Sequence, residues 1–270
     1  MQIIEYLHNI DIYSWQSITI LILAGFLVGL INTFAGNGTA LTYSLFLAMG
    51  FDATIANGTP RLGVVMQTLA ASLSFKKKKI LELKTGIILG IPTVLGSVVG
   101  AQIAVSIDKS LLEKIIALLM ILMLFFILYK PEKWIKGKNE AESKKMSIIH
   151  LLVYFLIGIY GGFIHVGVGI LLLFALVMIS GFDIIKANAL KVFIVLLYSP
   201  FSLLIFMFHN QVEYAVGLIS SIGNLFGGII AAYFAITWGG NFLKWFLISI
   251  ILISSSYSLG VLDFFYNLLV

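Results

Sequence analysis

The chain has 270 residues, no cysteine and little charge. The absence of cysteine excludes disulfide bonds, thiolate catalysis and thiolate metal sites. Charged residues make up 11% of the sequence, against roughly 25% in a soluble domain. Alternating strand patterns are also absent, which argues against an outer-membrane barrel. So little charge predicts a chain that lies largely in lipid.

The signatures of common enzyme classes are missing as well. No His-Glu-x-x-His, Gly-x-Ser-x-Gly or nucleotide-binding Walker pattern occurs, and no carboxylate cluster lies within an apolar segment. We therefore expect neither an enzyme nor a primary pump, and neither a cofactor nor a bound metal. The net charge of +5 comes from lysines gathered in two loops and calls for no nucleic-acid partner. The segment from Met1 to Trp15 lacks a basic start and a cleavage site, so we expect no signal peptide.

Apolar sequence, in contrast, is abundant. Hydrophobic residues make up 60% of the chain, and the mean hydropathy is +1.08. Runs of about 20 apolar residues recur, the length that crosses about 30 Å of hydrocarbon as a helix. We expect an all-α, multi-pass integral membrane protein in contact with the bilayer. The expected segments are 17–35, 38–50, 58–75, 85–106, 111–130, 147–165, 168–181, 188–208, 214–236 and 242–262.

Two parts of the chain are alike at an offset of 131 residues. Residues 36–104 and 167–235 share 19 identities in 69 positions. In a membrane protein, such self-similarity predicts a transporter built from two halves. We expect a first transmembrane repeat at 1–130, a basic cytoplasmic linker at 131–146 and a second repeat at 147–270. The matched pairs include Gly36 with Gly167, Gly38 with Gly169, Asp52 with Asp183, Asn57 with Asn188 and Glu82 with Glu213.

The lysines indicate how the two halves are oriented. Lys76–Lys79 with Lys84 form one basic loop and the linker forms another, and two segments separate them, so both can face the cytoplasm. The equivalent of the lysine run, 207–210, has no fixed positive charge, whereas 182–188 carries Lys186 where 51–57 has neither Lys nor Arg. This reversal predicts an odd number of crossings per half, hence inverted repeats of about five segments each.

The short second segment of each half leaves an alternative open. As a helix, 38–50 covers only about 20 Å, less than the hydrocarbon core. If it and its counterpart 168–181 are re-entrant, each half crosses the membrane four times and the repeats are parallel.

Glycine-rich breaks precede these short segments, at 32–39 and 161–169. Glycine tolerates unwound backbone, and at membrane depth such backbone lines a cavity or packs against protein. A helix that restarts there presents N–H groups and the positive end of its dipole, which suit an anion. The alternative is that the glycines allow close helix packing. The candidate residues at the breaks are Asn32, Gly36, Asn37, Gly38, Thr39, Gly167 and Gly169.

Arg61 and Lys191 are the strongest candidates for contact with an anion. Each follows a repeated asparagine, Asn57 or Asn188, near the start of an apolar segment. A cation in lipid costs at least about 2.5–3.5 kcal/mol, so such residues face a cavity or a partner. No intramembrane carboxylate in the first half neutralises Arg61, which favours a bound anion. The alternative is that both side chains snorkel to the headgroups.

Other polar residues near these cations allow two interpretations. Gln67 and its repeat partner Tyr198 face the same cavity or form hydrogen bonds in the core. His165, beside the second glycine break, couples transport to protons or is a neutral histidine bonded to backbone. Glu82 and Glu213 lie where segments begin, and we expect them to cap helices.

These motifs together resemble the TauE/SafE family, the sulfite-exporter or toluene-sulfonate-uptake permeases, over about residues 20–260. The resemblance implies a bacterial inner-membrane permease for sulfite, organosulfonates and related sulfur-containing anions. It also implies substrate contacts by Asn57, Thr59, Arg61, Asn188 and Lys191. The matching residues are Asn32-Thr33-x-Ala35-Gly36-x-Gly38-Thr39-x-Leu41-Thr42, Ala56-Asn57-Gly58-Thr59-x-Arg61 and Gln67, then Gly161-Gly162-Phe163-Ile164-x-x-Gly167-x-Gly169 and Ala187-Asn188-Ala189-Leu190-Lys191.

The chain departs from the family pattern at positions that line the expected site. Asn37 replaces the middle glycine, Pro60 a polar residue, Ser44 a proline, and His165 a glycine or glutamine. We expect these residues to influence which substrate is chosen.

The sequence thus predicts a secondary transporter that moves a small sulfur-containing anion by alternating access. An anion channel, or a transporter of another small carboxylate or inorganic anion, is the alternative. Coupling to protons or sodium and assembly into a homo-oligomer are both compatible with the sequence.

Overall fold

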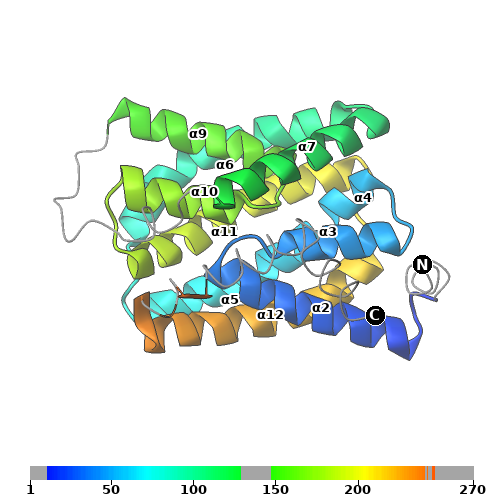
Figure 1. Cartoon of the computed structure of the whole chain (residues 1–270), viewed down its shortest axis with the longest axis horizontal. Helices are drawn as coiled ribbons and strands as arrows, with labels where there is room; N and C mark the ends of the chain where they lie inside the picture. The colour runs from blue at the N-terminus through cyan, green and yellow to red at the C-terminus, as the bar shows by residue number, and fades with distance from the viewer. Residues whose placement is uncertain (1–10, 129–146, 241, 243–244, 247–270) are drawn as a thin grey trace, which may run out of the picture.

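The computed structural model describes residues 11–128, 147–240, 242 and 245–246, and this part of the chain is helical without a strand (Figure 1). In the first half the elements are α2 (Trp15–Phe34), α3 (Thr39–Ala48), α4 (Ala53–Gly58), α5 (Pro60–Lys77), α6 (Leu83–Ser106) and α7 (Lys109–Leu128). In the second half they are α9 (Ile148–Phe163), α10 (Val168–Phe174), the π-helix η1 (Ala175–Ile179), α11 (Ile184–Phe208) and α12 (Tyr214–Thr237).

Local sequence explains where several helices begin. The Ser14 hydroxyl accepts a hydrogen bond from the Ser17 amide at the start of α2, and Asp183 accepts from Ile185 and Lys186 at the start of α11. Pro60 occupies the first turn of α5, where its missing N–H has no intrahelical partner to lose. Glu82 and Glu213 stand at the N-cap positions of α6 and α12, as expected. Their side chains accept no hydrogen bond from the first turn, so the expectation that they cap these helices was wrong.

Four helices among the described residues are long and apolar enough to cross a membrane: α2, α6, α11 and α12. Apart from α4, which forms between the expected segments 38–50 and 58–75 and was not predicted, the helices as far as α12 begin and end within a few residues of the expected segments. Two expected features, the linker 131–146 and nearly all of the segment 242–262, lie outside the described residues.

Helices of the two halves pack on one another in matching pairs. The 131-residue offset carries the bounds of α6 onto those of α12. α12 packs against α2 and α5 of the first half, and α6 packs against α9 and α11 of the second. Repeated glycines make these contacts close: a Cβ on Gly96 would lie 2.1 Å from the Phe155 oxygen, and one on Gly227 would lie 2.2 Å from the Phe26 oxygen. The packing role proposed for glycines therefore holds at these positions.

Contacts between loops fix which helix ends lie together. At one end, Glu82 before α6 pairs with Lys186 at the start of α11, with 3.7 Å between Nζ and Oε1. At another, the Glu213 amide before α12 donates to the Thr59 hydroxyl before α5 at 2.9 Å. In Figure 1, α2 begins at the right of the view and α9 at the left.

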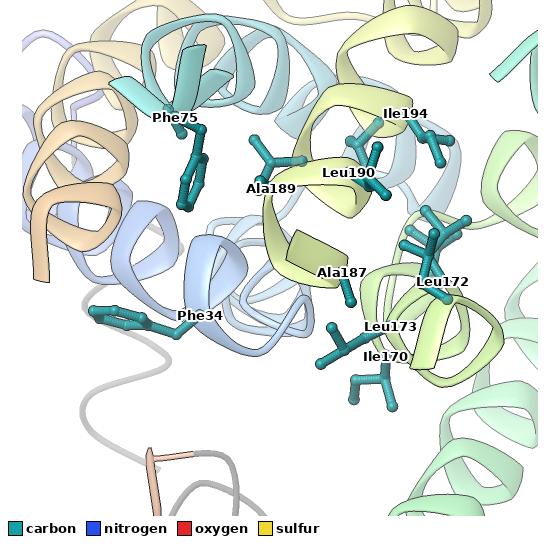
Figure 2. Close-up of a cluster of buried hydrophobic side chains, with 14 of the residues drawn as sticks. Phe34, Phe75, Ile170, Leu172, Leu173, Ala187, Ala189, Leu190 and Ile194 are labelled. Atoms are coloured by element: carbon teal, nitrogen blue, oxygen red, sulfur yellow. The ribbon is translucent and has the colours of Figure 1, made fainter. Parts of the chain in front are cut away.

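The largest buried apolar cluster brings together helices of both halves. It joins the end of α2 at Phe34, α5 at Phe75, α10 at Ile170 and Leu172, and α11 at Leu190. Figure 2 shows α11 side chains lying between those of α10 and those of α2 and α5. Both glycine breaks adjoin this core, which holds their backbone in place.

Candidate functional site

The two glycine breaks lie against each other. Gly36 has φ +79° in the first break, and Gly167 has φ +76° in the second. A Cβ on Gly36 would come within 2.4 Å of the Gly169 Cα, and a Cβ on Gly169 within 2.4 Å of the Gly36 Cα. The backbone conformation and the close approach together require glycine here.

Lys191 of α11 reaches the C-terminal end of α2. Its ammonium donates to the carbonyl oxygens of Asn32 at 3.2 Å and Thr33 at 2.9 Å. These acceptors belong to the last turn of α2, where carbonyls have no partner within the helix. A cation of the second half thus holds the broken helix of the first.

Arg61 of α5 makes the reciprocal contact with the end of α9. Its guanidinium donates to the carbonyl oxygens of Gly161 at 3.2 Å and Gly162 at 2.8 Å, and to the Ser202 hydroxyl at 2.9 Å. The guanidinium carbon also lies 4.4 Å from the centre of the Phe206 ring. Arg61 is therefore enclosed by protein groups on several sides.

Both cations are buried without a carboxylate partner. Arg61 is 0% exposed and Lys191 is 1% exposed, so neither snorkels to the headgroups. The ion pairs within the described residues, Lys109 with Asp52 and Lys186 with Glu82, lie at the surface. The cations are compensated by helix C-termini instead, which corrects the expectation that Arg61 stands unpaired.

The compensation leaves positive charge in the interior. A helix C-terminus is equivalent to about half a negative charge. The ends of α2 and α9 therefore offset about one of the two positive charges of Arg61 and Lys191. The positive charge that is not offset favours the entry of an anion.

A small cavity lies beside Lys191. Its volume is about 10 Å³, room for about one water molecule. Six predicted residues line it, along with Val64, Thr68, Val168, Val192 and Val195. The six are Asn32, Gly36, Gln67, His165, Gly169 and Lys191. Arg61 does not line the cavity, so the two cations differ in access.

The polar side chains at the cavity are held by one another. Asn32 Nδ2 donates to Gln67 Oε1 at 3.4 Å, and Gln67 Nε2 donates to the Thr33 hydroxyl at 3.1 Å. Asn32 Oδ1 also accepts from the Thr39 amide at 3.2 Å. The first amide of α3, expected to be free for an anion, is thus already bonded within the protein.

His165 joins the second break to α11 and to the first half. Its carbonyl oxygen accepts from the Thr39 hydroxyl at 3.3 Å, and its Nδ1 lies 3.1 Å from the Tyr198 hydroxyl, with which it is hydrogen-bonded. Within the described ranges, no group of three or more His, Cys, Asp or Glu is placed to hold a metal.

The other predicted residues lie around the cavity rather than in its wall. Asn57 donates to the Phe163 oxygen at 2.8 Å, and the Thr59 hydroxyl, fully buried between α4 and α5, accepts from the Glu213 amide. Gly38 packs on α2, where a Cβ would lie 2.6 Å from the Val28 oxygen. Asn37 and Gly167 belong to the turns of the two breaks.

Asn188 has a different environment from its repeat partner Asn57. It is 1% exposed, and neither atom of its side-chain amide has a hydrogen-bond partner in the described structure. It lies one helical turn before Lys191 and therefore shares a face of α11 with it. A buried polar group without a partner is costly.

Several functional groups were not found from the sequence. Thr33 acts through its carbonyl oxygen as well as its hydroxyl, Thr68 lines the cavity, and Ser202 binds Arg61. Main-chain acceptors leave no trace in sequence. Thr68 and Ser202 had a usable signal, since each is a polar residue in an otherwise apolar helix close to a residue already singled out.

Comparison with known proteins finds relatives that are named as membrane transporters. Residues 21–258 match the family model described as "Sulfite exporter TauE/SafE". A "Probable membrane transporter protein" of Haemophilus influenzae is 28% identical over 229 residues, which cover 84% of this chain and 88% of that protein. "Probable membrane transporter protein ORF9" of a Sinorhizobium species is 25% identical, with 86% and 88% covered. No solved structure matches the chain.

Proposed function

The chain belongs to the TauE/SafE family, and on that premise we propose that it is a secondary transporter for a small sulfur-containing anion, such as sulfite or an organosulfonate, in the inner membrane of a bacterium. The observation that carries the proposal is Lys191, a buried cation without a carboxylate partner in the wall of a cavity that Asn32, Gln67 and Thr68 also line.

Lys191 is the substrate's counter-charge in this mechanism. Its two bonds to carbonyl oxygens of α2 use two of the three N–H donors of an ammonium group. An incoming anion receives the third and competes for the other two, because a charged acceptor binds an ammonium more strongly than a carbonyl does. Gln67, Thr68 and His165 supply further hydrogen-bonding groups beside it.

Arg61 positions the site rather than touching the substrate. Its guanidinium is bonded to the end of α9 and to Ser202 and does not reach the cavity wall. It contributes positive potential, and it holds the second break in the conformation that brings Gly169 against Gly36.

Substrate entry requires the protein to move. The cavity has room for about one water molecule, and a sulfite or sulfonate ion has several heavy atoms. Arg61 and Lys191 join opposite halves, so relative motion of the halves changes the cavity directly. We propose alternating access in which one half rocks against the other around the paired breaks.

The arrangement of the loops supports halves inserted in opposite orientations. Glu82 and Glu213 are repeat partners. Glu82 pairs with Lys186 in the first turn of α11, while Glu213 binds Thr59 just before α5. The start of α11 therefore lies at the end of the molecule where α5 ends, although α5 and α11 are repeat partners. Repeat partners that run in opposite directions are what inverted repeats require. The end with Lys76–Lys79 and Lys186 is the basic one, and we assign it to the cytoplasm.

The test is flux into proteoliposomes containing the purified full chain. Uptake of sulfite, a taurine-like sulfonate, sulfate, chloride and acetate is compared with and without a pH gradient. We expect saturable, carrier-type uptake of a sulfur-containing anion, loss of that uptake in Lys191→Gln, and partial retention in Lys191→Arg. Lys186→Gln, which removes an exposed lysine outside the site, is the matched control.

Three outcomes would overturn parts of this proposal. Unchanged uptake in Lys191→Gln would remove Lys191 from the site. Currents far above carrier turnover would identify a channel. Uptake of acetate or chloride in preference to every sulfur-containing anion would place the substrate in another class.

A further inference from the structure

A large apolar crevice lies on the outer surface of α5, α11 and α12, apart from the cavity at Lys191. Its volume is about 550 Å³. Leu203 of α11 forms its floor and is 7% exposed, while Met66 of α5 on the rim is 40% exposed. Leu218, Ile222 and Phe226 of α12 line the other side at a spacing of four residues and are 50–58% exposed.

The chemistry of the crevice separates it from the anion site. Ser221 supplies a polar side chain to the lining, and its hydroxyl already donates to the Gly217 oxygen. Arg61, one residue before the lining residue Leu62, is 0% exposed and directs its guanidinium to the end of α9. An occupant of the crevice therefore finds no charge and no free hydrogen-bonding group.

The matching groove of the other half differs in its packing at one position. The 131-residue offset carries Leu62 onto Phe193, Met66 onto Leu197 and Ser221 onto Gly90. Leu62 and Phe193 pack alike, since Cδ1 of each lies 2.5 Å from where a Cβ on Gly217 or Gly86 would stand. Cδ1 of Leu197, in contrast, lies 2.4 Å from where a Cβ on Gly90 would stand, and Ser221 carries a side chain at the matching place. Leu197 therefore packs into its groove, whereas Ser221 does not allow Met66 the same approach.

The position of the crevice along the helices matches one leaflet of a bilayer. Leu62 and Leu218 lie shortly after Thr59 and Glu213, which are bonded to each other, so the crevice is near that end of the molecule. From Leu218 to Phe226, α12 rises about 12 Å. Half of the hydrocarbon core is about 15 Å.

We propose that this crevice binds one acyl chain of a membrane lipid, in the leaflet opposite the basic loop of Lys76–Lys79. The bound chain supplies the apolar contacts that Leu197 supplies in the other half. Recognition is of the hydrocarbon chain and not of the headgroup, because the lining has no charge.

The test uses the full chain in phosphatidylcholine vesicles that contain a trace of phosphatidylcholine with a photoactivatable diazirine in one acyl chain. After illumination, labelled peptides are identified by mass spectrometry. We expect several-fold more label around Met66 and Ile222 than around their counterparts Leu197 and Ile91. Equal labelling of the two faces would overturn the proposal.

Two reciprocal substitutions sharpen the test. Ser221→Gly copies the other half, lets Met66 approach α12, and should lower the label at Ile222 several-fold. Gly90→Ser copies this half and should raise the label at Ile91, which keeps the proposal testable if Ser221→Gly does not fold. Labelling that neither substitution changes, or a cross-link at Ile222 to a second copy of the chain in place of lipid, would overturn the assignment.

Discussion

The ammonium nitrogen of Lys191 lies 2.9 Å from the carbonyl oxygen of Thr33, a residue 158 positions earlier in the chain. Arg61 makes the reciprocal contact with Gly161 and Gly162. In each case a cation of one half compensates the C-terminal end of the broken helix in the other. The two halves are therefore joined electrostatically at the place where their backbones are least regular.

Gly36→Ala tests the contact between the breaks. The φ of +79° costs a residue with a Cβ about 1–2 kcal/mol, and the clash with Gly169 adds to that. We expect a loss of folding free energy larger than the backbone cost alone, measured by denaturant titration in detergent. Gly239→Ala is the matched control, since Gly239 has φ +74° and nothing within 4 Å of its Cβ position. Equal losses in the two variants would contradict the contact.

Arg61→Gln tests the positioning role of the guanidinium. The variant leaves the Gly161 and Gly162 oxygens without these donors, and a buried unsatisfied group costs about 1–3 kcal/mol. We expect the free energy of unfolding to fall by about 2–6 kcal/mol for the two groups together. Lys186→Gln, at an exposed pair, should change it far less. A fully stable Arg61→Gln protein that has lost only anion affinity would instead make Arg61 a substrate contact.

Gln67→Glu places a negative charge in the cavity wall that Lys191 shares. The carboxylate keeps the acceptor used by Asn32 and removes the donor used by Thr33. We expect it to pair with Lys191 and to weaken anion binding at least about tenfold, or about 1.4 kcal/mol. Binding is measured by isothermal titration in detergent. Gln211→Glu, in the loop before α12, is the control, and similar weakening there would point to a general effect of charge.

Asp183 and Asp52 are repeat partners with different structural roles. The Asp183 carboxylate caps α11 by accepting from two amides, whereas Asp52 makes no cap bond to α4 and pairs with Lys109. Asp183→Ala should therefore lower the free energy of unfolding by about 1 kcal/mol, and Asp52→Ala by less. Asp183→Asn should retain most of the stability, because asparagine caps as well as aspartate. Thermal unfolding of the three variants checks the order.

Much of the fold could be predicted because the signals are local. Apolar runs predicted the helices within a few residues, except for the short α4, which has no long apolar run of its own. The glycine-rich stretches around Gly36 and Gly167 predicted where two helices break. The cap at Asp183 and the proline at the start of α5 are also local signals. The site was predicted only in part. Six candidate residues meet at one cavity, but Thr59 bonds to the Glu213 amide instead and Arg61 turns away toward α9.

The sequence by itself determined that the chain is apolar and helical, that it repeats at an offset of 131 residues, and that Arg61 and Lys191 follow repeated asparagines. These properties are written in residue types and their spacing. Only the tertiary structure decided what the two cations bind. Their acceptors are carbonyl oxygens 100–159 residues away, and every residue carries such an oxygen, so its availability depends on where a helix ends and which helix packs beside it.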